Sequence, residues 1–194
     1  MKEEILNPEE SLQIINQVIN RAKNRIADDG VLFIFWGWLV IVASMINYFT
    51  VKTGYDYGYL AWIILMPLGG IYSAIYGYKQ KKKSQSNSYV GMYLGYLWTA
   101  FGIALLISLI FMYPHGVKTT YFFLMLLYGI ATMVSGGLLQ FKPLVFGGVF
   151  SFVCAVASVF VPDLEQLLII ALAIFGSYVV PGHLLRSKYK SQNV

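Results

Sequence analysis

Six long apolar stretches occupy most of the chain between residues 31 and 185. Apart from Glu165 at the start of the last one, they contain no Asp, Glu, Lys or Arg. A helix needs about 20 apolar residues to cross the hydrocarbon core of a bilayer, and these stretches are apolar on all sides rather than along one face. The sequence therefore predicts an all-α, polytopic membrane protein with six transmembrane helices. The predicted spans cover residues 31–50, 59–78, 90–113, 119–141, 144–162 and 164–185.

The composition supports one membrane-embedded domain with two short flanking segments. Of the 194 residues, 12% are charged, whereas soluble domains carry about 25%. We expect a helical bundle over residues 31–185, preceded by a segment over 1–30 and followed by a basic tail over 186–194. The connections are short, and one of them is the predicted turn at Lys142-Pro143. Pro181-Gly182 is predicted to bend or end the last helix, because proline cannot donate a backbone hydrogen bond.

The basic residues are divided unequally between the two sides of the predicted bundle. Twelve Lys and Arg lie at the termini and in the second and fourth connections, against only Lys52 and Lys118 on the other side. Cytoplasmic loops carry such an excess, so both termini are predicted to face the cytoplasm, with the protein in the inner (plasma) membrane. The net charge of +5 then reflects topology, and no nucleic-acid binding is expected. A basic cluster follows the second span and comprises Lys79, Lys81, Lys82 and Lys83. It is a candidate contact for anionic lipid headgroups. The simpler role of the cluster is to fix the topology.

An amphipathic helix is predicted over residues 8–27, before the first span. Asn7 and Pro8 are typical of a helix start, and Glu10 can complete a capping box. Apolar residues then recur at helical spacing, from Leu12 to Ile26. Such a helix lies on the inner membrane surface or on the bundle, or else binds a protein partner.

Three similar stretches favour an arrangement of three helical hairpins. Residues 35–39, 93–97 and 145–149 each place glycine among aromatic or aliphatic residues near the start of an odd-numbered span. Together with Gly136-Gly137, Gly147-Gly148 and the Lys142-Pro143 turn, this pattern over residues 31–185 resembles the small six-span bacterial inner-membrane proteins of the HdeD type. The resemblance implies a stress-related role, and the N-terminal helix departs from that pattern.

Small residues four positions apart allow helix backbones to approach closely. They are candidates for packing within the bundle, with contact in a homo-oligomer as the alternative: Gly69, Ser73 and Gly77 in the second span, Gly91 and Gly95 in the third, and Gly147 and Ser151 in the fifth. A second group is the candidate lining of an apolar cavity: Trp36, Trp38, Trp62, Tyr72, Tyr96 and Trp98, with Asn47 as the polar member.

The sequence predicts no enzyme, metal site or cofactor. His115 and His183 belong to opposite sides of the membrane, and Cys154 is alone. The favoured hypothesis is a non-enzymatic membrane protein with an accessory, regulatory or stress-related role, acting through helix packing and its N-terminal helix. The alternative is a small transporter or channel for a neutral or lipophilic compound. Charged residues inside spans usually mark ion and proton pathways, so proton-coupled transport is disfavoured.

Overall fold

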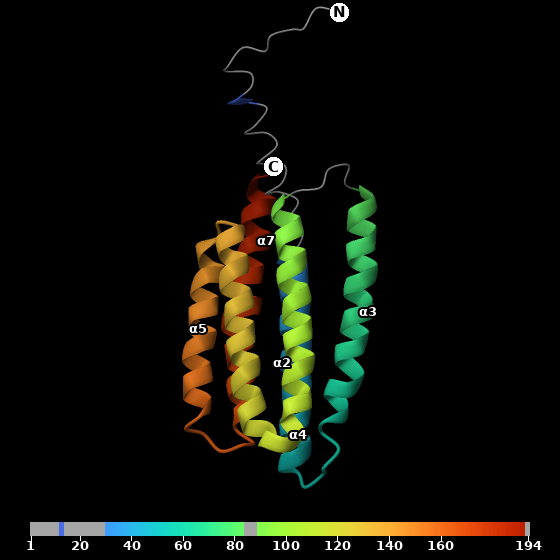
Figure 1. Cartoon of the computed structure of the whole chain (residues 1–194), viewed down its shortest axis with the longest axis vertical. Coiled ribbons are helices and arrows are strands. Elements are labelled where there is room, and N and C mark those ends of the chain that lie inside the picture. The colour runs from blue at the N-terminus through green and yellow to red at the C-terminus, as the bar shows by residue number, and fades with distance from the viewer. Residues whose placement is uncertain (1–11, 14–29, 84–88, 193–194) are drawn as a thin grey trace, which may run out of the picture.

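The computed structural model describes residues 12–13, 30–83 and 89–192, and the longer two of these stretches are almost entirely helical (Figure 1). Five helical segments are long and apolar enough to cross a membrane. The described chain is therefore an all-α protein of the polytopic membrane type. Its elements are α2 (Gly30–Lys52), α3 (Leu60–Lys83), α4 (Tyr89–Leu138), α5 (Lys142–Ser158), α6 (Gln166–Ile174), the π-helical segment η1 (Phe175–Val179) and α7 (Val180–Gln192).

The predicted helix over residues 8–27 and nearly all of the 1–30 segment lie outside the described residues. Leu12 and Gln13 alone are described there, and both are helical and exposed. The proposed partner contact of that helix therefore stays a prediction.

Helix α4 consists of two antiparallel halves that meet at Gly116. Gly116 has φ 82 and ψ 169, a conformation that residues with a Cβ rarely adopt. The rings of Phe101 and Tyr128 lie 5.0 Å apart, whereas a straight helix would separate residues so far apart in sequence by about 40 Å. Figure 1 shows the chain descending through the first half and returning through the second. The break coincides with the connection expected between the third and fourth spans.

The last helical rod is continuous from Gln166 to Gln192, but it widens by a π-turn at η1. Pro181 lacks an N–H group, and its ring conflicts with the carbonyl four residues earlier, that of Ser177. The N–H of Val180 bonds to the carbonyl of Phe175, five residues back, so one extra residue is accommodated in the turn before the proline. The helix therefore does not end at Pro181-Gly182 and continues as α7.

Helix α5 is shorter than the predicted span 144–162 and ends at Ser158. The Ser158 hydroxyl donates to the carbonyl of Ala155 at 2.7 Å, and the Gln166 side chain donates to the carbonyl of Ser158 at 2.9 Å. These bonds satisfy the carbonyls of the last turn, so the chain leaves the helix there. At 17 residues, α5 is about 25 Å long, below the length of the five candidate spans.

The turn before α5 also differs from the expectation. It lies at Leu139–Phe141 in place of Lys142-Pro143, because Gln140 takes the left-handed conformation with φ 51. Lys142 and Pro143 are the first residues of α5, where proline is tolerated since the first N–H groups of a helix need no intrahelical partner.

The core is formed by α2, the second half of α4, α5 and the rod α6–η1–α7. Their backbones approach closely because glycines face the neighbouring helix. A Cβ on Gly37 would lie 2.7 Å from Val179, one on Gly148 2.7 Å from Met133, and one on Gly136 2.6 Å from the backbone of Val145. Such contacts are the usual means by which membrane helices pack, since lipid supplies no hydrophobic driving force between them.

Candidate functional site

Four aromatic side chains from three helical rods meet at the centre of the bundle. Tyr178 of η1 is 2% exposed. Its ring centroid lies 5.4 Å from those of Phe33 and Tyr128 and 6.2 Å from that of Trp98. The rings meet mostly edge to face or tilted, which is the favourable geometry for aromatic pairs. The centre of the described bundle is thus filled by side chains in mutual contact.

Several hydroxyl groups near this centre have no hydrogen-bond partner among the described residues. They are those of Ser135, Ser177 and Tyr178, and all three side chains are buried. Thr132 is a polar neighbour of the Tyr178 hydroxyl, but it donates its own hydrogen bond to the carbonyl of Tyr128 at 2.7 Å. The centre therefore has polar character without a charge.

Other serines link neighbouring helices directly. The Ser44 hydroxyl donates to the carbonyl of Leu167 at 2.6 Å, joining α2 to α6. The Ser151 hydroxyl donates to the carbonyl of Met125 at 2.9 Å, joining α5 to the second half of α4. These side chains are engaged in holding the core together, as small polar residues commonly are in membrane proteins.

Asn47 lies close to the connection between α2 and α3. It is 8% exposed and is a polar neighbour of the Tyr121 hydroxyl. A Cβ on Gly58 would overlap the Asn47 amide oxygen, so the connection passes directly against this side chain. The polar side chain that the sequence leaves without a partner therefore lies beside a second polar group.

The candidate cavity residues are spread over different surfaces of the protein. Trp98 belongs to the aromatic centre, Trp36 bonds Ser73, and Trp62 packs partly against the core with its indole N–H unpaired among the described residues. The other aromatic candidates, Trp38, Tyr72 and Tyr96, are exposed. The Tyr72 ring also contacts the rings of Phe35 and Tyr76. The structure therefore does not gather this set around one space.

The small-residue faces also differ from one another. Gly147 meets the backbone of Ser177, and Ser151 reaches α4 as described above. Gly69 faces Trp36 and Leu39 of α2, and Ser73 accepts from Trp36. The remaining members, Gly77, Gly91 and Gly95, are exposed. A Cβ on Gly77 or Gly95 would meet nothing within 4 Å.

Two helical segments bury little of their apolar surface, and we refer to α3 together with the first half of α4 (residues 89–112) as the open flank. One face of that half of α4 still packs on the core through Leu94, Trp98 and Phe101. Only 11% of the apolar window of α3 and 6% of that of residues 90–112 is buried inside the protein, against 39–56% for the other three long spans. The backbone of α3 comes close to that of α2 alone among the described helices, and Figure 1 shows α3 set apart on one side.

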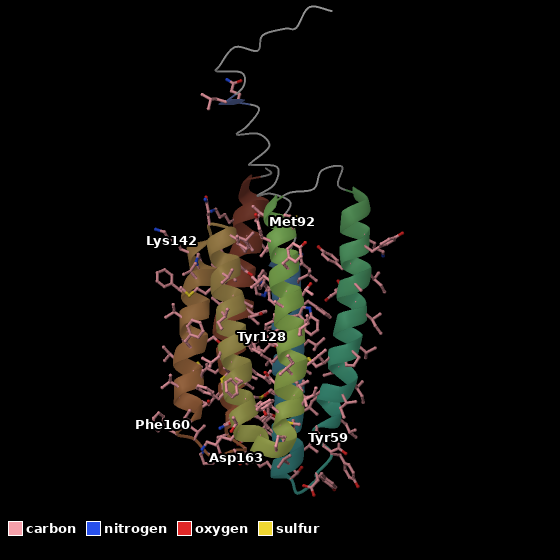
Figure 2. All side chains as sticks on the ribbon, viewed as in Figure 1. Tyr59, Met92, Tyr128, Lys142, Phe160 and Asp163 are labelled. Carbon is pink, nitrogen blue, oxygen red and sulfur yellow. The ribbon has the colours of Figure 1, made fainter. Side chains whose placement is uncertain are left out.

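The charged residues lie at the ends of the bundle. Figure 2 shows Lys142 and Met92 at one end, and Tyr59, Phe160 and Asp163 at the other. Lys79 is exposed on the last turns of α3, and the backbones of Lys81, Lys82 and Lys83 continue that helix. Within the described residues, no group of three or more His, Cys, Asp or Glu is placed to hold a metal ion.

The aromatic centre and the π-turn were missed by sequence reasoning. Tyr128 and Tyr178 lie in the interior of predicted spans, far from the interfacial belts where tyrosine is enriched, and that position was the available signal. Pro181 indicated an irregularity in the last helix, but it did not indicate that this irregularity is a π-turn.

No family model matches this chain, and no curated protein and no solved structure is found to be similar to it. The resemblance to HdeD-type proteins stays a prediction from the glycine motifs.

Proposed function

We propose that this chain is a non-enzymatic accessory protein of the membrane that works by associating with other membrane helices through its open flank. The partner is the transmembrane helix of another membrane protein, in the simplest case a second copy of this chain. The predicted amphipathic helix over 8–27 would add a contact at the membrane surface.

The observation that carries the proposal is the unequal burial of the spans. Three of the five long spans bury 39–56% of their apolar windows, and the two helices of the open flank bury 11% and 6%. A helix held by few neighbours contributes little to the stability of its own bundle. Its surface is therefore available to a partner.

Glycine positions distinguish this flank from a surface built only to face lipid. In the core, Gly37, Gly136 and Gly148 each face a neighbouring helix at close range. On the open flank, Gly70 and Gly77 of α3 and Gly95 and Gly102 of α4 face open space. Glycine within a helix costs about 0.5–1 kcal/mol relative to alanine, and lipid contact gives nothing in return. The close approach of another helix, in contrast, offsets this cost.

The same proposal includes six spans arranged as three hairpins, with both termini in the cytoplasm. The two halves of α4 supply separate spans, and α5 is within the shortest lengths that cross a bilayer, about 17 residues. The segregation of charge supports the orientation. All the described carboxylates, Asp56, Asp163 and Glu165, lie at the end opposite Lys142.

Transport of a neutral or lipophilic compound is the second candidate. It needs a path between helices, whereas the centre of the described bundle holds four rings in contact. The candidate lining residues point to different surfaces. We therefore prefer association.

Co-purification of two differently tagged copies from native membranes tests the proposal. We compare the wild-type chain with a Gly95→Leu/Gly102→Leu variant, in which the new side chains enter open space and leave the fold intact. The matched control is Val149→Leu/Val153→Leu on the exposed face of α5. The wild type and the control should retrieve the same partners, the tagged second copy included, and the flank variant should lose them. Equal retrieval by all three proteins would refute the proposal.

A further inference from the structure

An apolar groove runs along the outer surface of the bundle between α5 and the rod formed by η1 and α7. Its volume is about 540 Å³. It is lined by Phe146, Gly147 and Phe150 of α5 and by Gly176, Val180 and Leu184 of the rod. Figure 2 shows α5 at the edge of the bundle. The lining residues Phe146, Val180 and Leu184 are exposed, so the groove is open at the surface of the protein.

The groove owes its shape to the two glycines. Gly147 approaches so closely that a Cβ there would lie 2.9 Å from the Cα of Ser177. The Phe150 ring lies over Gly176, where a Cβ would overlap it. The lining residues run from Pro143 to Phe150 on α5, about 10 Å along the helix axis. A groove of this length suits the first part of a flexible apolar chain.

Basic residues surround the end of the groove at which α5 begins. Lys142 directly precedes Pro143, which lines the groove, and Lys188 follows Leu184 by four residues, on the same face of α7; both are exposed. The ammonium group of Lys188 lies 5.6 Å from the ring of Phe141, which places the end of α7 beside the start of α5. Every carboxylate among the described residues is at the opposite end of the bundle. An anion is therefore favoured at this mouth.

We propose that this groove binds an anionic phospholipid, with one acyl chain between α5 and α7 and the phosphate between Lys142 and Lys188. The apolar walls and the basic mouth together match the two parts of such a lipid. Basic pockets between membrane helices are typical sites for anionic headgroups. This lipid site lies across the bundle from α3 and does not depend on the association proposed for the open flank.

Native mass spectrometry of the full-length protein in detergent tests the site. The probes are phosphatidylglycerol, phosphatidylcholine with the same acyl chains, and inorganic phosphate. The Lys142→Gln/Lys188→Gln variant removes charge at the mouth, and Leu184→Trp fills the groove. Because Leu184 is 49% exposed, the larger ring enters the groove without disturbing the core; Val180→Trp is a second variant of the same kind. The matched controls are Lys79→Gln, at the same end but on α3, and Val153→Trp, on α5 outside the groove.

We expect phosphatidylglycerol to bind at least tenfold more tightly than phosphatidylcholine, since each basic residue near an anionic lipid contributes appreciably. Loss of two charges should lower phosphatidylglycerol affinity about thirtyfold and leave phosphatidylcholine unchanged. Filling the groove should weaken both lipids, and the controls should bind as the wild type does. Equal binding of the two lipids by the wild type, or full binding by Leu184→Trp and Val180→Trp, would overturn the proposal. Displacement of the lipid by inorganic phosphate alone would also overturn it, in favour of a simple phosphate site.

Discussion

The indole N–H of Trp36 donates a hydrogen bond of 2.8 Å to the hydroxyl of Ser73. This bond joins α2 to α3, the helix that has few other neighbours within the described bundle. Gly69, one turn earlier on α3, receives the edge of the same indole ring. Trp36 therefore contributes two of the contacts that attach α3 to α2.

Replacing Ser73 by alanine should loosen α3 without unfolding the core. The change removes one hydrogen bond between membrane helices, worth about 0.6 kcal/mol on average. Hydrogen–deuterium exchange should rise in α3 and stay unchanged in the rod α6–η1–α7. A Ser73→Thr variant keeps the hydroxyl and serves as the control. A uniform increase across all helices would contradict this localised role.

Glycine-to-alanine substitutions should have opposite effects in the core and on the open flank. At Gly37, a Cβ would lie 2.7 Å from Val179 and 3.1 Å from Tyr178, so Gly37→Ala should destabilise the protein by about 1–3 kcal/mol. At Gly102, a Cβ meets nothing within 4 Å, and Gly102→Ala should stabilise the monomer by about 0.5–1 kcal/mol through helix propensity. Steric trapping in bicelles measures both free energies of unfolding. Equal effects at the two positions would contradict the described packing.

Asn47 and Tyr121 should be coupled in stability. Their polar side chains are neighbours and are expected to interact, so Tyr121→Phe and Asn47→Ala should each destabilise the protein, and the double variant should cost less than the sum. We expect a coupling of about 0.6 kcal/mol or more in a double-mutant cycle. Additive effects would mean that the two side chains act independently.

The all-α, polytopic membrane class of this protein was predictable, because long stretches without charged residues indicate helices that are surrounded by lipid and not by water. The third and fourth predicted spans leave a connection at residues 114–118, and the structure places the break of α4 there, at Gly116. The end of α5 was not predictable, because it depends on Gln166 reaching Ser158 across the connection. That contact has no signature in a hydropathy pattern.

The sequence likewise did not predict which helices pack against each span. Gly95 of α4 and Gly147 of α5 occur in similar sequence surroundings, yet Gly95 faces open space and Gly147 meets Ser177. Small residues show that a face permits close approach, but they do not say which helix fills it. The aromatic centre around Tyr178 likewise arises from residues far apart in sequence.

The proposed orientation predicts a clear labelling pattern. In a Cys154→Ala background, a cysteine at Ser86 should resist an impermeant thiol reagent in intact cells, and one at Thr53 should react, because the basic residues favour the cytoplasmic side. Labelling after permeabilisation confirms that both cysteines are reactive. The reverse pattern would overturn the orientation, and reaction at both positions would overturn the count of spans between them.

Cysteine crosslinking in native membranes tests the association of the open flank most directly. In the Cys154→Ala background, a cysteine replaces Gly95 on the flank, and in a separate protein one replaces Val153, which is 61% exposed on α5. A short bifunctional thiol reagent should link the Gly95→Cys protein to a second copy or to another membrane protein, and give little product from the Val153→Cys protein. Equal yields from the two positions, or no product from Gly95→Cys, would contradict association through this flank.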